Sequence, residues 1–345
     1  MKLLWAALVF VFVAALVGCS TANGNPQALT PTTMAVVFAS ETPLTPTLTS
    51  SPEVEKTSAT VYTPTQSAPE ASSTAAPTET PTSVPSPEPT PTLGPEDWKT
   101  QPMIPTISEN VYQIYRRGLK LGNDVHSFSK IGDCGGTPAW FLGDFDRGEK
   151  FYSLGEYESL DEVIQYYQGS YGRTSLAAKS AYNASSVFTQ IWADPELCQS
   201  GETPLVCEYR VHRPIMAIIA LGTNDVYHPD KFEPQMRRII EYSIDNGVIP
   251  ILATKADNLE GDGSINATIA RLAYEYDIPL WNYWRAVQPL PDHGLQEDGA
   301  HLTWAVNKFD DPHAMRSGWT VRNLTALQVL DAVWQGLNNH TKGAP

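Results

Sequence analysis

The sequence has few positive charges and no cluster of them. Its 345 residues include 23 Lys and Arg against 38 Asp and Glu, which gives a net charge of −15 at pH 7. Nucleic-acid binding needs clustered Lys and Arg along the phosphate backbone, so nucleic acid is not an expected partner. The seven histidines are scattered, with no His-x-x-x-His or Cys-x-x-Cys spacing. Neither a metal nor another cofactor is therefore expected.

Long hydrophobic runs are also missing. The apolar run Leu3–Val17, which follows Lys2, is too short for a stable membrane span and has the layout of an export signal. It ends in Leu16-Val17-Gly18-Cys19, which resembles the bacterial lipobox. The resemblance implies cleavage before Cys19 and a diacylglyceryl group on its sulfur, which would anchor the protein to a membrane at the extracellular face of the cell envelope. An ordinary secretory signal with a chance cysteine is the alternative.

Large apolar residues are rare in residues 20–100, which are rich in Thr, Pro, Ser and Ala and hold half of the chain's 28 prolines. Such a segment cannot bury enough apolar surface to offset its ordering entropy. Frequent proline favours extended conformations, typical of a semi-stiff spacer. The sequence predicts a signal peptide over 1–18, a disordered stalk over 19–100 and one folded domain over 101–342, expected to act as a monomer.

Cysteine is scarce, with four in the chain. Cys198 and Cys207 flank a loop-like stretch, and in an exported protein this pair predicts a disulfide that closes a small loop. Two separate buried thiols are the alternative. Cys134 is then the odd cysteine of an exported chain, and such a residue is a candidate for chemistry.

Apolar runs alternate with helical patterns through the domain. The expected strands are 126–131, 214–221, 248–253 and 278–281, with a weaker one near 175–178. One helix is expected to begin at a capping box of Ser159 with Glu162. Two more are expected over 231–246 and 264–277, and the last helix is expected to begin at a cap formed by Asn323. This alternation predicts a parallel sheet with helices on both faces. Sites in such sheets form in loops beyond the carboxyl ends of the strands.

Three polar motifs occupy loops of this kind. Gly132-Asp133-Cys134-Gly135 follows the first expected strand, and Gly222-Thr223-Asn224-Asp225 follows the run 214–221. Asp298-Gly299-Ala300-His301 lies in a loop before the last helix. In this order the motifs suggest a nucleophile, an amide donor and a base held by a carboxylate.

These blocks resemble those of the SGNH/GDSL hydrolase family over most of residues 105–340. The resemblance implies a flavodoxin-like three-layer α/β/α fold and hydrolysis of acyl esters. It places Cys134 where the family has its nucleophilic Ser, with His301 as general base and Asp298 as the group that orients it. It also implies an oxyanion hole built from the backbone N–H of Cys134, the N–H of Ala181 and the side-chain amide of Asn224.

Each block also has a plainer interpretation. Asn224 alone would fit an Asx turn after a buried strand, and Asp298 with His301 alone would fit surface polarity. His293, beside Asp292, competes with His301 for the role of base. Ala at 181 departs from the family's Gly, because alanine tolerates positive φ poorly.

The cysteine at position 134 leaves two hypotheses open. A Cys beside a His and a helix N-terminus can have a pKa of about 3.5–7.5, which favours a thiolate nucleophile that attacks esters. Sulfur is larger than oxygen, however, and small misplacements can lower a rate by about 100-fold. The domain is therefore expected to be either a cysteine esterase for small-molecule or glycan esters, or an inactive relative that binds such ligands.

Overall fold

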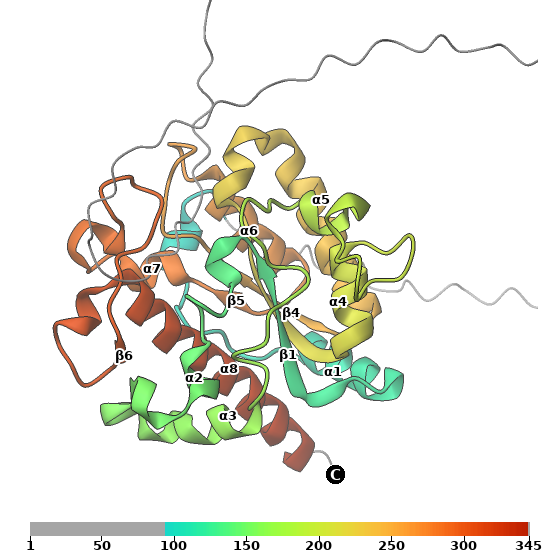
Figure 1. Ribbon diagram of the computed structural model, residues 1–345, viewed down its shortest axis with the longest axis horizontal. Coiled ribbons are helices and arrows are strands. Elements are labelled where there is room, and N and C mark those ends of the chain that lie inside the picture. The colour runs from blue at the N-terminus through green and yellow to red at the C-terminus, as the bar shows by residue number, and fades with distance from the viewer. Residues whose placement is uncertain (1–93, 344–345) are drawn as a thin grey trace, which may run out of the picture. The chain divides into compact units, whose positions relative to one another are not determined.

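The computed structural model describes residues 94–343, so the signal segment, Cys19 and the expected stalk up to residue 93 lie outside the described residues. The helices are α1 (Glu109–Leu121), α2 (Asp144–Arg147), α3 (Asp161–Tyr166), α4 (Pro204–His212), α5 (Pro229–Asp245), α6 (Ser264–Glu275), α7 (Tyr283–Val287) and α8 (Gly318–Gly343). The strands are β1 (Asp124–Gly132), β2 (Tyr152–Ser153), β3 (Pro214–Ala220), β4 (Ile249–Ala253), β5 (Leu280–Trp281) and β6 (Asn307–Lys308). Figure 1 shows their arrangement.

The main sheet is parallel, with the strand order β1-β3-β4-β5. An isolated parallel bridge joins Gly132 to Ala178, and the N–H of Gly132 donates to Ala177 O at 3.1 Å. The weak strand expected near 175–178 is thus reduced to one bridge, on the side of β1 away from β3. Order and direction match the flavodoxin-like α/β fold that the family resemblance implied. A separate two-stranded sheet pairs β2 with β6.

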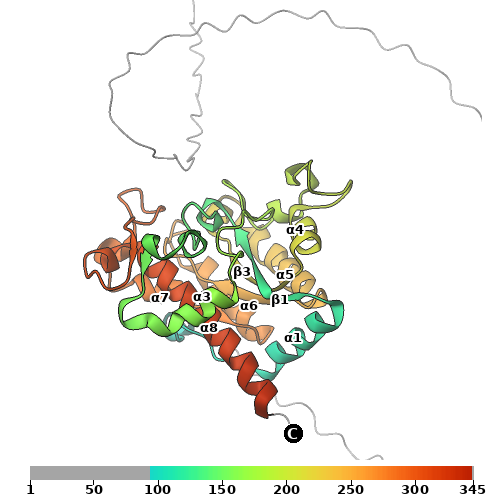
Figure 2. The same cartoon turned by 60° about the horizontal axis from the view of Figure 1, so that its bottom comes forward.

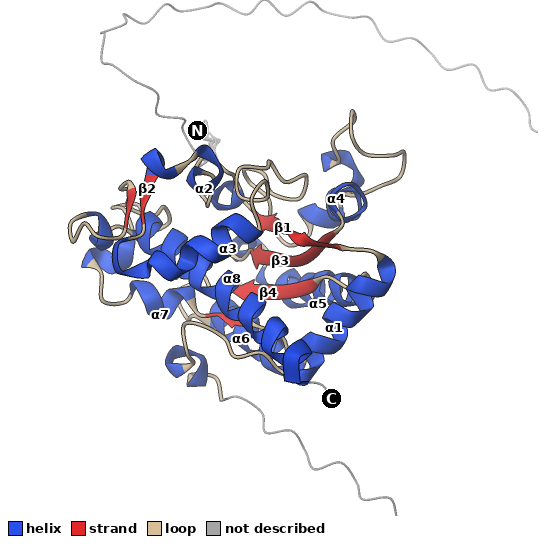
Figure 3. Cartoon of the chain, turned by 90° about the horizontal axis from the view of Figure 1, so that it is seen from below, coloured by secondary structure: helices blue, strands red, loops and turns tan. Residues whose placement is uncertain are grey.

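Helices cover both faces of the main sheet (Figures 2 and 3). All five residues of β4 are buried, as are the first six of β3, although successive side chains point to opposite faces. This is why both strands are continuous apolar runs in the sequence rather than alternating patterns. α1 packs against β3 and β4, and α5 and α6 pack against β4.

The register brings the carboxyl ends of the central strands to one edge. Ile131 of β1 pairs with Ile219 of β3, which pairs with Leu252 of β4. β1, β3 and β4 therefore end side by side, and the loops that follow them meet at this edge.

The folded part begins slightly before residue 101. Trp98 is buried, and its ring lies 4.7 Å from that of Trp284, centroid to centroid. The buried Asn282 donates from its side chain to Trp98 O at 2.7 Å and to Gln101 O at 3.1 Å. Within residues 94–343, no helix is long and apolar enough to cross a membrane.

Two expected helix starts are wrong. Ser159 lies inside a 3₁₀ turn (Gly155–Leu160), and α3 begins after Leu160 without a side-chain cap. Asn323 does not cap the last helix, because α8 already begins at Gly318. The Asn323 side chain is buried and instead accepts a hydrogen bond from the N–H of Leu142 at 2.9 Å. A tertiary contact, rather than a cap, explains asparagine at this position.

The predicted disulfide is confirmed. Cys198 and Cys207 are bonded, with their Cα atoms 5.3 Å apart, and tie the loop before α4 to that helix. Glu202 lies close enough to both sulfurs for the three to resemble a metal site, the one such group among residues 94–343. Bonded sulfurs cannot serve as thiolate ligands, so this group holds the loop rather than a metal.

Candidate active site

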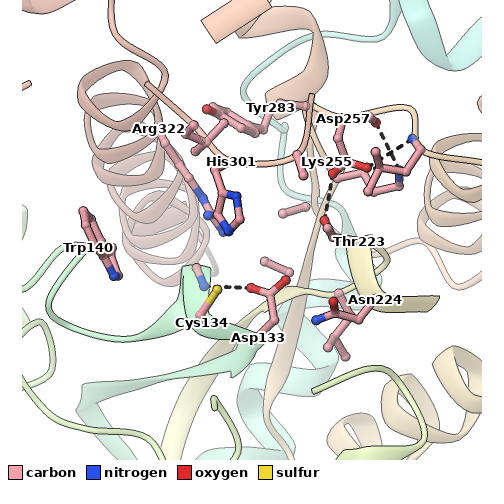
Figure 4. A pocket seen from close by; sticks show the side chains of 18 of the residues that line it. Asp133, Cys134, Trp140, Thr223, Asn224, Lys255, Asp257, Tyr283, His301 and Arg322 are labelled. Atoms are coloured by element: carbon pink, nitrogen blue, oxygen red, sulfur yellow. Dashed lines mark hydrogen bonds and ion pairs between the residues drawn. The ribbon is translucent and has the colours of Figure 1, made fainter. Parts of the chain in front are cut away.

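A cavity of about 390 Å³ opens at the edge where β1, β3 and β4 end. Cys134, Ala181, Asn224 and His301 all line it, although they come from four separate segments of the chain. Figure 4 shows this cavity with Cys134 and Asp133 facing the His301 ring. The structure therefore brings the motif residues from the sequence to one place.

The turn after β1 is shaped by close backbone contacts. A Cβ at Gly132 would lie 2.8 Å from Ala220 O of β3, so only glycine fits where the strand ends. Asp133 then caps a 3₁₀ turn that begins at Cys134, and its carboxylate accepts from the N–H of Gly135 at 2.7 Å. Burial raises the pKa of Asp133, while the nearby Arg322 guanidinium and this hydrogen bond act in the opposite direction. Asp133 therefore anchors the turn.

Cys134 stands at the start of this turn and lines the cavity. Its carbonyl accepts from the hydroxyl of Thr137 at 2.8 Å, which fixes the backbone of the turn. The structure records Cys134 as disulfide-bonded, and no cysteine of the described part is a free thiol. Thiolate chemistry at Cys134 therefore requires its reduction first.

Ala181 lines the cavity with a φ of +66°. This left-handed conformation strongly favours glycine, the residue that the family resemblance implied at this position. The backbone geometry of a glycine is thus kept although the residue is alanine.

Asn224 joins the loop that contains Ala181 to the loop that follows β3. Its side-chain amide donates to the carbonyl of Tyr182 at 2.9 Å, and its side chain also lines the cavity. The neighbouring Asp225 is buried and accepts from the N–H of Ala184 at 2.9 Å. Burial raises the pKa of Asp225 to about 6. The hydrogen bond between Asp225 and Ala184 fixes the two loops together and thereby positions Asn224.

His301 and Asp298 form a hydrogen-bonded pair. Nδ1 of His301 lies 2.5 Å from Oδ2 of Asp298, and Oδ1 of the same carboxylate accepts from the N–H of His301 at 2.9 Å. Burial acts to raise the pKa of Asp298, but the hydrogen bonds from His301 and from the backbone outweigh it and hold the pKa at about 2. The carboxylate is thus ionised at neutral pH and holds Nδ1 of His301 in a hydrogen bond. Proton transfer at His301 would therefore use Nε2.

The competing histidine is not part of the site. His293 lies in a 3₁₀ turn (Pro291–Gly294), where its Nδ1 contacts Gln288 O at 3.1 Å, and neither it nor Asp292 lines the cavity. The choice between the two histidines therefore falls on His301.

The sequence motifs missed three cavity residues, Lys255, Asp257 and Arg322. The Lys255 ammonium is buried against Asp257 at 2.6 Å and Glu260 at 2.5 Å, and Asp257 also accepts from the hydroxyl of Thr223 at 2.7 Å. Arg322, in the second turn of α8, also lines the cavity. The Lys-x-Asp spacing directly after the run 248–253 could have indicated the first group. Nothing in the sequence near position 322 could have indicated the arginine.

Comparisons with known proteins find similarity among solved structures. No family model and no curated protein matches the chain. One matching structure is described as that of a lipolytic protein of the G-D-S-L family from Desulfitobacterium hafniense, with 15% identity, a TM-score of 0.37, and coverage of 59% of this chain and 98% of that chain. Another is a GDSL-like lipase from Bacteroides thetaiotaomicron, with 15% identity, a TM-score of 0.36, and coverage of 64% and 98%. Both descriptions name the family that the three sequence blocks resemble.

Proposed function

We propose that the domain is a carboxylic ester hydrolase of the SGNH/GDSL type. The observation that carries the proposal is that His301, hydrogen-bonded to Asp298, lines one cavity together with Cys134, Ala181 and Asn224. A base held by a carboxylate, a candidate nucleophile and three candidate oxyanion donors are the parts that acyl transfer needs.

The proposed reaction begins with the reduced Cys134 thiol. Nε2 of His301 takes its proton, and the thiolate attacks the carbonyl carbon of the ester. The resulting oxyanion accepts hydrogen bonds from the backbone N–H groups of Cys134 and Ala181 and from the Asn224 amide. Collapse breaks the bond to the alcohol oxygen, which leaves with the proton from His301, and a thioester remains on Cys134. His301 then deprotonates a water, which releases the acid and restores the thiol.

A binding protein without turnover is the second candidate. The observations that favour it are two departures from the family pattern, Cys134 in place of the nucleophilic Ser and Ala181 in place of Gly. In this alternative the cavity holds an acyl or glycan ligand, and His301 and Asn224 bind it rather than transform it.

We further propose that the protein works at the extracellular face of the cell envelope, anchored through a lipid on Cys19 and held off the membrane by the stalk over 19–100. A lipidated Cys19 cannot form a disulfide, so in this anchored form the sulfur of Cys134 is reduced. The support for this is the lipobox-like Leu16-Val17-Gly18-Cys19 and the Thr/Pro-rich composition that follows it. Esters on extracellular glycans or small molecules are the substrates that such a location favours. Labelling of the expressed chain with a radioactive fatty acid tests the anchor, and Cys19→Ala should abolish the label.

The test of function is hydrolysis of p-nitrophenyl acetate and of a thioester by the purified full chain, with and without a thiol reductant. We expect turnover only after reduction, and its loss in Cys134→Ala and His301→Ala. His293→Ala is the matched control and should retain activity, because His293 lies outside the cavity. Cys198→Ser with Cys207→Ser separates reduction of that disulfide from reduction at Cys134.

The two candidates predict different results. Turnover by the reduced wild type that is lost in Cys134→Ala supports the esterase. Turnover by Cys134→Ser alone would refute the cysteine mechanism and leave a hydrolase scaffold whose nucleophile has been lost. Inactivity of all variants would favour the binding protein.

A further inference from the structure

The Arg322 guanidinium occupies an unusual place for a charged group. It projects from α8 into the wall of the cavity, next to the turn that carries Cys134 (Figure 4). A Cβ added to Gly135 would lie 2.7 Å from Nη1 of Arg322 and 3.6 Å from the Trp319 ring. The glycine therefore leaves the space that the guanidinium fills.

Aromatic rings surround this cation. The guanidinium carbon lies 4.7 Å from the centroid of Phe141, 5.1 Å from that of Trp319 and 5.7 Å from that of Tyr283. Ring faces attract a cation, and at desolvated sites the interaction is worth about 2 kcal/mol. The rings hold the guanidinium in position, but they offer no oxygen atom to accept a hydrogen bond from its N–H groups.

Among the described residues, no oxygen atom accepts a hydrogen bond from the buried Nε–H of Arg322. Nε of Arg322 is buried without a hydrogen-bond partner, and within residues 94–343 the guanidinium has no ion pair. Other arginines of the domain, such as Arg210 and Arg237, are paired with glutamates. The carboxyl group of Asp133 lies nearby and attracts the guanidinium, but it forms no hydrogen bond with it, and a buried N–H without an acceptor is unfavourable.

The charges around the cavity limit which anion fits. Lys255 is already neutralised by Asp257 and Glu260, so Arg322 is the cation that remains for a ligand on this wall. Asp133 acts on Arg322 electrostatically from close by, since a Cβ at Gly135 would lie 3.0 Å from Oδ1 of Asp133 as well as 2.7 Å from Nη1 of Arg322. One available cation and a nearby carboxyl group favour a monoanion over a doubly charged phosphate. A planar carboxylate also matches the geometry of a guanidinium.

We infer that Arg322 is a binding residue for a carboxylate group of the ligand, so that the cavity selects esters or acyl groups that carry a second, negatively charged carboxylate. The inference deepens the proposed function by naming the substrate class. As a binding property it holds whether or not Cys134 turns the ligand over.

The test is calorimetric binding of benzoate and of its neutral counterpart benzamide to the full chain. We expect benzoate to bind at least about tenfold more tightly, as for hydrogen bonds to charged groups. Arg322→Met should abolish that preference and leave benzamide affinity within about twofold, which also shows that the variant is folded. Arg322→Lys keeps the charge without the planar fork and should retain part of the preference.

Two further variants keep the inference refutable. Asn224→Ala should leave the preference intact; loss of the preference there, and not in Arg322→Met, would place the carboxylate in the oxyanion hole and overturn the inference. Gly135→Ala should weaken benzoate binding, because its Cβ displaces Nη1. Tighter binding of inorganic phosphate than of benzoate, or no preference in the wild type, would also overturn it. Absence of ester hydrolysis with the preference intact would refute only the proposed function.

Discussion

Lys130 allows a quantitative test of the burial of β1, the strand that leads into the turn of the candidate nucleophile. It lies in the middle of the buried part of β1 with 2% of its surface exposed, and its ammonium donates to Tyr171 O at 2.6 Å. Burial, aided by repulsion from Arg173, lowers the pKa of Lys130 from 10.5 to about 7. Lys130→Met removes the titrating group and keeps a long apolar side chain.

The sign of the effect follows from proton counts. Between pH 7 and 10.5 the unfolded lysine binds its proton while the folded one has lost it. The free energy of unfolding of the wild type therefore rises with pH in this window, by about 2 kcal/mol from pH 7 to pH 9 for this group alone. Lys130→Met lacks that contribution. It also leaves Tyr171 O without its donor, at a cost of about 1–3 kcal/mol that does not depend on pH.

Urea unfolding of both chains at pH 7, 8 and 9, followed by tryptophan fluorescence, measures this difference. We expect the stability of Lys130→Met relative to wild type to fall by about 2 kcal/mol across the range. Groups common to both chains cancel in the comparison. The exposed Lys120→Met is the matched control and should show no such trend. Parallel pH profiles for wild type and Lys130→Met would show that Lys130 is protonated in the fold, and would refute the reasoning.

Three more perturbations test the loops around the cavity. Replacing both Cys198 and Cys207 by serine should lower the free energy of unfolding by about 2.5 kcal/mol, measured by urea denaturation, because a closed loop of nine residues' separation is released. Ala181→Gly should raise it by up to about 1 kcal/mol by relieving the positive φ, whereas Ala184→Gly, where φ is ordinary, should lower it. The raised pKa of Asp225 means that the contribution of this group to stability falls as pH rises from about 4 to 6, and thermal melts should show that Asp225→Asn gains stability relative to wild type over this range.

The central strands were predictable because their burial is recorded in the sequence itself. A run such as 214–221 can bury every side chain only between two helical layers, so composition alone fixes its place. The edge near Ala178 was harder to predict, because one bridge to Gly132 leaves hardly any pattern. Helix starts failed at Asn323 for a different reason: a polar residue that bonds a distant backbone N–H looks like a cap from the sequence.

The site also contains parts that the local sequence indicates and parts that depend on contacts between distant segments. Asp298 and His301 are three residues apart, so one loop suffices to join them, and the motif could be found locally. Arg322 reaches the cavity only because α8 packs beside the turn at Gly135, nearly two hundred residues earlier in the chain. Its role depends on which acceptors are absent around it, and a sequence does not show that.

Unfavourable local features in this cavity point to its use. Ala181 adopts a left-handed conformation without ending a helix, unlike Arg213, whose positive φ is that of a helix C-cap. Arg322 lacks an acceptor for a buried N–H. Each feature is unfavourable by about 1–3 kcal/mol in isolation. A ligand with a carbonyl oxygen facing the Ala181 N–H and a carboxylate at Arg322 would satisfy both donors at once, so the strained backbone and the buried N–H without an acceptor have one common explanation.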